Sequence, residues 1–214
     1  MKPLLILRPE PGNSATAARA QAMGLEAVQC PLFEIEPVAW RPPDPAPYDR
    51  LLLTSANALR HGGAKLARLT SLDVLAVGTA TADAARGAGF TVALTGDDGV
   101  DALLAALPGD QRLLHLTGAD HVQLAARHRI ERVVVYRSVP AAASIPPGRT
   151  VALVHSPRAG ARLADLAPSR ADLAIAAIST AAAAACGTGW AALEAADRPD
   201  DMALLALAAR LCQD

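Results

Sequence analysis

The sequence is poor in aromatic residues and has no excess of charge of either sign. Aromatic side chains make up 3% of the 214 residues, and 20 basic residues, almost all arginines, face 21 acidic ones. Proteins that bind nucleic acid or anionic membranes usually carry a basic stripe, so neither is an expected partner. Because 52% of the residues are hydrophobic and most of these are Ala and Leu, we expect closely packed helices on sheets.

Sites for metals and common cofactors are also missing. Cys30, Cys186 and Cys212 show no C-x-x-C spacing, which excludes a zinc ribbon and a disulfide framework and favours buried thiols. No G-x-G-x-x-G follows a strand and no P-loop motif occurs, so the sequence predicts no dinucleotide cofactor. The histidines lack metal-ligand spacing, and we expect no metal.

Long hydrophobic runs are missing with one exception, residues 173–193, which carry no charge. Gly187, Gly189 and the Ser179–Thr180 pair make this stretch a poor membrane span, and it reads better as a buried strand that runs into an Ala-rich helix. The apolar run before Arg8 is too short for a signal peptide. The protein is therefore expected in the cytoplasm.

What the sequence does contain is one local pattern stated twice, about 100 residues apart. Each copy reads as strand, Ser-containing turn, helix, strand, small-residue turn and helix. A unit of this length indicates duplicated α/β domains. The first copy covers 51–60, 76–90 and 99–107, and the second covers 152–162, 176–190 and 201–211.

Two proline-rich segments, 41–49 and 137–148, mark the domain boundaries. Between them lie five apolar strand candidates, at 50–54, 73–77, 91–94, 112–116 and 132–136. The rest of the chain supplies another five, at 4–7, 26–30, 150–155, 173–178 and 190–193. Asn13 or Ser14 is expected to cap the first helix.

The sequence thus predicts an α/β protein of two similar parallel-sheet, flavodoxin-like domains joined by a two-stranded linker. The first domain is discontinuous, with residues 1–37 and 140–214, and the inserted domain covers 40–136. The linker strands are expected side by side at about 32–40 and 131–140.

In open parallel sheets, ligands bind where strands end and helices begin, and helix N-termini favour anions. For any single Ser or Thr at such a turn, helix capping is the better interpretation, and what favours binding is their number at equivalent points of the two domains. From the residues alone we expect a cofactor-free binder of a small anion in an interdomain cleft. The candidate binding residues are Arg8, Thr54, Ser55, Asn57, Gly78, Thr79, Thr81, Thr117, Gly118, Ser156, Arg158, Ser179 and Thr180.

Six short motifs, taken in order, resemble the uroporphyrinogen-III synthase family over nearly the whole chain. They are R-P-E, P-L-F-E-I-E-P, T-S-A-N-A, V-G-T-A-T-A, V-V-V-Y-R-S and H-S-P-R-A-G. The resemblance implies a cytoplasmic lyase of porphyrin, tetrapyrrole and heme biosynthesis. Such an enzyme takes hydroxymethylbilane, removes its terminal hydroxyl and closes the macrocycle with inversion of the last pyrrole ring, giving uroporphyrinogen III.

The same resemblance implies a small-molecule substrate, no metal or organic cofactor, and a monomer. It leaves open a transient contact with the preceding pathway enzyme. A substrate with many carboxylates can be held by main-chain N–H groups at helix N-termini, which suits a net charge of −1.

The family's V-Y-x-[ST] motif matches Val135, Tyr136, Arg137 and Ser138, which makes Tyr136 the catalytic candidate. A tyrosine hydroxyl is ordinarily protonated at neutral pH and can donate to a departing hydroxide. The alternative is a linker tyrosine that packs on apolar surface. Two other functions remain open at this point: a non-catalytic binder of a tetrapyrrole or other small polyanion, and an unrelated two-domain solute-binding protein.

Overall fold

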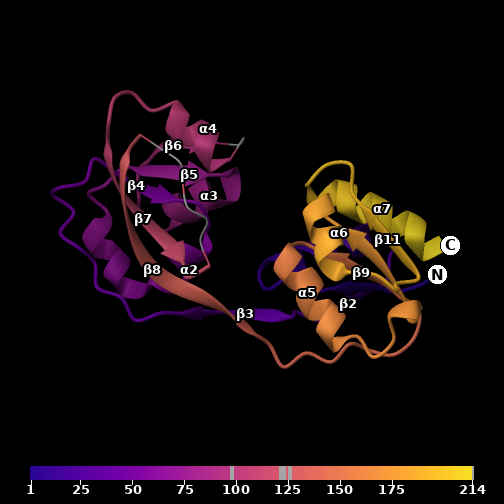
Figure 1. The fold of residues 1–214 in the computed structure, drawn as a ribbon. Coiled ribbons are helices and arrows are strands. Elements are labelled where there is room, and N and C mark those ends of the chain that lie inside the picture. The colour runs from indigo at the N-terminus through magenta and orange to yellow at the C-terminus, as the bar shows by residue number, and fades with distance from the viewer. Residues whose placement is uncertain (97–98, 121–123, 125–126, 214) are drawn as a thin grey trace. The chain divides into compact units, whose positions relative to one another are not determined.

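The structure, a computed structural model, describes residues 1–96, 99–120, 124 and 127–213. The chain divides into two compact units (Figure 1). The discontinuous unit consists of residues 1–34 and 139–214, and the inserted unit of residues 35–138.

Strands and helices alternate along both units. The discontinuous unit contains β1 Leu4–Ile6, α1 Gly12–Ala22, β2 Ala27–Gln29, β9 Thr150–Val154, α5 Pro157–Leu166, the 3₁₀ turn Arg170–Asp172, β10 Leu173–Ala177, α6 Thr180–Cys186, β11 Ala192–Ala195 and α7 Asp201–Gln213. The inserted unit contains β4 Arg50–Leu53, α2 Asn57–Gly62, the 3₁₀ helix Gly63–Leu69, β5 Val74–Val77, α3 Thr79–Gly87, β6 Val92–Gly96, α4 Val100–Ala105 and β7 Arg112–Gly118. The strands β3 Phe33–Pro37 and β8 Arg129–Pro140 cross from one unit to the other.

The two sheets share one spatial order, although the chain enters them at different strands. One sheet runs β2-β1-β9-β10-β11, and the other contains the run β8-β7-β4-β5-β6, with every neighbouring pair in both runs parallel. The first order is that of flavodoxin-like sheets. The second is the same order circularly permuted, with β7 in the place of β1 and β4 in the place of β9. The repeat in the sequence therefore corresponds to β4 and β9, the central strands.

A sixth strand, β3, lies against β8 at the edge of the inserted unit's sheet. The main-chain N–H of Val38 donates to Val135 O at 2.9 Å, and that of Ala141 donates to Leu32 O at 3.0 Å, so the two segments run antiparallel. The sequence predicted five strands for this sheet and a separate two-stranded linker of 32–40 beside 131–140, whereas the structure joins β3 to the sheet through β8. The sixth strand forms because β8, with 12 residues, presents a long edge of main-chain donors and acceptors that needs a partner.

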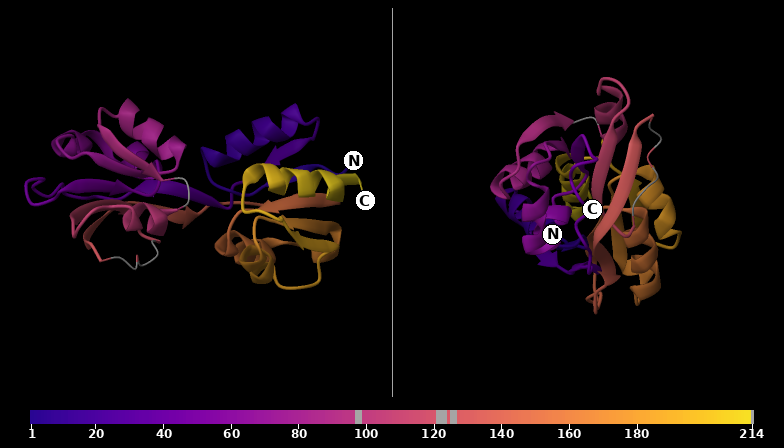
Figure 2. Two further views of the ribbon diagram at one scale, coloured as in Figure 1. Left: turned by 90° about the horizontal axis from the view of Figure 1, so that it is seen from above. Right: turned by 90° about the vertical axis from the view of Figure 1, so that its left-hand side faces the viewer.

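Successive side chains of β1 enter two different cores, because they point to opposite faces of the sheet. Leu4 and Ile6 pack with residues of α1 and α7, while Leu5 and Leu7 pack with residues of α5 and α6. Figure 2 shows α1 and α7 on one face of this sheet and α5 and α6 on the other. Burial on both faces explains why these strands are continuous apolar runs.

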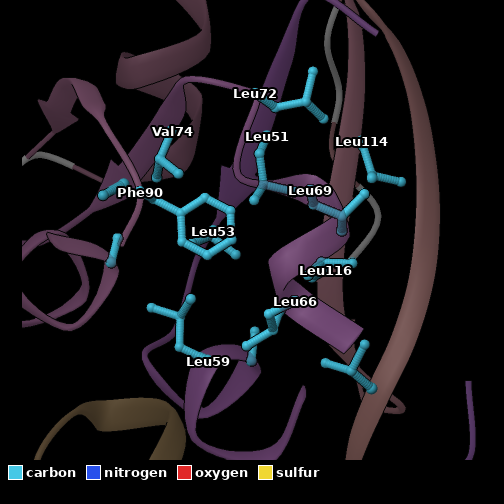
Figure 3. Close-up of a cluster of buried hydrophobic side chains, with 14 of the residues drawn as sticks. Leu51, Leu53, Leu59, Leu66, Leu69, Leu72, Val74, Phe90, Leu114 and Leu116 are labelled. Atoms are coloured by element: carbon cyan, nitrogen blue, oxygen red, sulfur yellow. The ribbon is translucent and has the colours of Figure 1, made fainter. Parts of the chain in front are cut away.

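The same arrangement holds in the inserted unit. Leu51 and Leu53 of β4 face a core built with α2, the 3₁₀ helix and α3, which Figure 3 shows, and Leu52 faces α4. The uncharged stretch at 173–193 contains the buried strand β10 and the Ala-rich helix α6. Within the described residues, no helix is long and apolar enough to cross a membrane.

One predicted helix cap is wrong. The helix α1 begins after Pro11, and neither Asn13 nor Ser14 caps it; the Glu10 carboxylate instead accepts from the main-chain N–H of Ser14 at 3.1 Å. Asn13 is buried instead, and its Nδ2 donates to the carbonyls of Ile6 and Arg8, at 2.8 Å each. The amide therefore fixes the turn between β1 and α1, whose carbonyl groups need a donor.

Candidate functional site

Ligands of parallel sheets bind at the carboxyl ends of the two central strands, where the strand order reverses. In the discontinuous unit these strands are β1 and β9, and in the inserted unit they are β7 and β4. Five candidate binding residues lie at these points: Arg8 and Ser156 in one unit, and Thr54, Thr117 and Gly118 in the other. The other candidates lie at the starts of neighbouring helices or in the turns before them.

A cluster of charged groups, here called the Asp201 cluster, occupies the reversal point of the discontinuous unit. The carboxylate of Asp201 accepts hydrogen bonds from Thr16 Oγ1 at 3.0 Å, Arg8 Nη1 at 3.3 Å and Arg19 Nη1 at 2.6 Å. It also accepts from His155 Nε2 at 2.9 Å. A carboxylate only accepts, so Nε2 of His155 carries a hydrogen. The cluster joins β1, α1, β9 and α7.

The cluster keeps Asp201 ionised. Burial alone raises the pKa of Asp201, but the hydrogen bonds from His155 and Thr16 and the charges of His155 and Arg8 outweigh it and lower the pKa to about 2. Sequence reasoning missed this group, because Asp201 reads only as an acidic residue in the first turn of a helix. Its partners come from residues 8–19 and 155, which the strand order brings to it.

Asp201 is expected to make the protein sensitive to acid. With its pKa lowered from 3.8 to about 2, the carboxylate adds stability that is fully present above its unfolded pKa and is lost as the pH falls through its folded pKa. The effect corresponds to about 2 kcal/mol. Urea unfolding of Asp201→Asn at several pH values should show a free energy of unfolding that is lower by this amount at neutral pH. Between about pH 5 and pH 2, that free energy should depend less on pH than it does in the wild type.

The control for this measurement is Glu194→Gln, which removes an exposed ion pair with Arg210. Because exposed pairs contribute little, it should change the free energy of unfolding by less than about 1 kcal/mol. If Asp201→Asn keeps the wild-type pH dependence, Asp201 is not the acid-sensitive group.

The serines at the starts of α5 and α6 act as helix caps. Ser156 Oγ accepts from Ala159 N, and Ser179 Oγ accepts from Ala182 N, both at 3.2 Å. The capping alternative is therefore correct for these two hydroxyl groups. A ligand at either turn can then be bound by main-chain N–H groups, by the hydroxyl hydrogens or by neighbouring side chains.

Two further candidates lie beside these caps at the surface. Arg158, in the first turn of α5, is exposed and places its guanidinium 4.3 Å from the centre of the Phe33 ring. Thr180, the first residue of α6, is exposed as well. Both side chains are accessible to solvent at the carboxyl edge of the sheet.

In the inserted unit, Thr54 follows β4 and shares a hydrogen bond of 3.0 Å with Nε2 of His115, which is buried in β7. Ser55 Oγ accepts from the main-chain N–H of Asn57 at 3.2 Å. The amide oxygen of Asn57 accepts from Arg60 at 3.2 Å. These contacts order the turn before α2.

The three candidates in the turn before α3 differ in conformation and in exposure. Gly78 adopts a φ of 79°, a left-handed conformation that favours glycine, and its N–H donates to Gly96 O at 2.8 Å. Thr81 is buried, whereas Thr79 is exposed. Of the three candidates in this turn, Thr79 is the one whose side chain faces solvent.

Tyr136 lies on β8 directly opposite Gly118 of β7. A Cβ atom on Gly118 would lie 2.6 Å from Cε2 and 2.7 Å from Cζ of Tyr136, so the ring covers the space that a side chain would fill. The ring also packs on the core shown in Figure 3, and its centre lies 6.3 Å from that of His61. Burial and the charge of Arg60 lower the pKa of His61, which favours the neutral imidazole.

The three cysteines are free. Cys186 and Cys212 are buried and Cys30 is partly buried, and burial raises the pKa of each thiol. Within the described residues, no group of three or more His, Cys, Asp or Glu side chains is placed to hold a metal ion.

Fold and site together define an α/β protein of two related sheets with polar groups at the reversal point of each and two arginines at that of the discontinuous unit. Residues 14–206 match the family model described as uroporphyrinogen-III synthase HemD. Because this match spans most of the chain, the protein belongs to the uroporphyrinogen-III synthase family. The resemblance found in the sequence motifs is thereby confirmed, as is the assignment to porphyrin biosynthesis.

Solved structures agree with this fold. The uroporphyrinogen-III synthetase of Helicobacter pylori 26695 matches with a TM-score of 0.69 at 18% identity, over 99% of this chain and 100% of that one. A mutant uroporphyrinogen III synthase of the extremely thermophilic bacterium Thermus thermophilus matches with a TM-score of 0.54 at 17% identity, again over 99% and 100%. The predicted fold class is confirmed. A search of curated protein sequences found no match.

Proposed function

We propose that this chain is a lyase that converts hydroxymethylbilane into uroporphyrinogen III, with loss of water and inversion of the last pyrrole ring. The family match over residues 14–206 carries this proposal. The placement of Tyr136 over Gly118, at the end of a central strand, supports a role for the tyrosine at the site.

Tyr136 acts as the general acid in this proposal. Its hydroxyl donates to the departing hydroxyl of the substrate, which leaves as water and creates an electrophilic carbon. Inversion requires this carbon to bond to the already substituted α-carbon of the last pyrrole, whose bond to its original methylene bridge then breaks. The freed methylene carbon bonds to the unsubstituted α-carbon of the same ring, which loses a proton. The reaction as a whole therefore releases one water, and the tyrosine is restored. Much of the selectivity for isomer III over the symmetric isomer then depends on how the site holds the flexible chain. The last ring must present its substituted carbon to the electrophilic carbon before spontaneous closure occurs.

The carboxylates of the substrate are bound, in this proposal, at the carboxyl ends of the strands. Main-chain N–H groups at the starts of α3 and α5 and the partial positive charge there are suited to anions. We propose as binding residues Arg8, Thr54, Ser55, Asn57, Gly78, Thr79, Thr81, Thr117, Gly118, Ser156, Arg158, Ser179 and Thr180. We further propose a cytoplasmic monomer with the domains bounded as the sequence predicts.

Product analysis tests the function directly. The purified protein is incubated with freshly generated hydroxymethylbilane, and the uroporphyrinogen isomers are separated. We expect the rearranged isomer III to dominate, with a rate that a chelator leaves unchanged. If the protein binds the tetrapyrrole but yields only the symmetric isomer of spontaneous closure, it is a non-catalytic binder.

A further inference from the structure

The Asp201 cluster holds more positive than negative charge. One carboxylate faces the two guanidinium groups of Arg8 and Arg19 and the ring of His155. Arg19 has 46% of its side chain exposed, so solvent screens it, whereas Arg8 lies deeper, with 33% exposed. A cationic group that its partner does not neutralise, at the reversal point of a parallel sheet, is placed to bind an anion.

Arg8 is held through one of its terminal nitrogens and through its main chain. Its Nη1 donates to Asp201 Oδ1 and to Thr16 Oγ1, both at 3.3 Å. Its main-chain carbonyl accepts from Asn13 Nδ2 at 2.8 Å, which fixes the backbone. Within the described parts of the chain, no hydrogen bond uses Nε or Nη2 of Arg8. These two atoms form the edge of a guanidinium that binds a carboxylate through two parallel hydrogen bonds.

Gly12, the first residue of α1, makes room for this position of Arg8. A Cβ atom on Gly12 would lie 2.3 Å from Nε, 2.6 Å from Cζ and 2.7 Å from Nη2. The guanidinium therefore lies over the glycine backbone. Any side chain at position 12 has to displace the guanidinium.

We propose that Arg8 binds a carboxylate side chain of the substrate through its Nε and Nη2 edge, and that Asp201 is a positioning residue that holds Nη1. Thr16 and Gly12 support the same placement. This inference rests on the proposed function, because it takes the polycarboxylate substrate of that reaction as the ligand.

Steady-state kinetics of three variants test the proposal. Arg8→Gln should raise KM for hydroxymethylbilane by about tenfold with little change in kcat, since it removes charge-assisted hydrogen bonds made to the bound substrate. Asp201→Asn should raise KM by a smaller factor. In the Arg8→Gln background it should add nothing, because its effect acts through Arg8. Titration with uroporphyrinogen III should show the same losses of affinity.

Gly12→Ala tests the placement without removing any polar group. Gly12 does not have a positive φ, so alanine can adopt its backbone conformation and the variant should fold, which thermal unfolding checks. Its Cβ should displace the guanidinium and raise KM as Arg8→Gln does. Glu194→Gln is the matched control and should leave KM unchanged. It breaks an exposed ion pair with Arg210, which lies on α7, the helix that also carries Asp201.

The outcomes separate the two claims. A wild type that neither turns over hydroxymethylbilane nor binds uroporphyrinogen III overturns the proposed function. An active wild type whose Arg8→Gln and Gly12→Ala variants keep the wild-type KM overturns this inference alone. If Asp201→Asn lowers thermal stability but leaves KM unchanged, or tightens binding, Asp201 does not position Arg8.

Discussion

Replacing Tyr136 by phenylalanine is expected to lower kcat by about 100-fold or more while KM changes little. The substitution removes the hydroxyl and keeps the ring, which packs on the core and over Gly118. General acid catalysis contributes about 100-fold or more to rates. An interaction made chiefly in the transition state lowers kcat without weakening substrate binding.

The isomer ratio provides a second measurement on the same variant. As the enzymatic rate falls, spontaneous closure should overtake it, and the symmetric isomer should replace isomer III. The chain has two tyrosines, so Tyr48→Phe is the matched control. Tyr48 is buried in the same core with Arg112 over its ring, and its loss should leave rate and isomer ratio intact. If Tyr136→Phe behaves like Tyr48→Phe, Tyr136 is a packing residue.

The inner strands could be predicted from the sequence because both of their faces are buried. Runs such as Leu51–Leu53 and Leu173–Ala177 are apolar throughout, and each has close to the expected bounds. The order of the strands could not be predicted in the same way. The sequence repeat pairs β4 with β9, but it does not show that β7 and β8 take the places of β1 and β2.

The candidate site was predicted in part. A residue that follows a buried strand can be placed at the carboxyl edge from its position in the sequence, and Arg8 and Ser156 were found in this way. Contacts between residues far apart in the sequence cannot be predicted in this way. Asp201 meets Arg8 across 193 positions of sequence and His155 across 46. The sequence likewise does not show why position 118 is a glycine, because the reason is the ring of Tyr136 on the neighbouring strand.

Gly118→Ala is expected to lower kcat by at least about tenfold, because the new methyl group would lie 2.6 Å from the ring of Tyr136 and must push it aside. The atoms that it meets belong to the far end of the tyrosine side chain, so the ring can move and the fold should survive. Kinetics of the variant, with thermal unfolding measured alongside, test this expectation. Gly87→Ala is the matched control, since nothing lies within 4 Å of a Cβ at that position, and it should keep the wild-type kcat.

A double-mutant cycle then decides what Gly118 does. If Gly118 acts by leaving room for the ring of Tyr136, Gly118→Ala should lower kcat hardly any further in the Tyr136→Phe background. The hydroxyl whose position matters is already absent there. The product isomers of the single variant should also shift towards the symmetric form, as they do for Tyr136→Phe. If kcat of the double variant falls by the product of the two single effects, Gly118 acts independently of the tyrosine. That result is expected of a position where the main chain itself approaches the substrate.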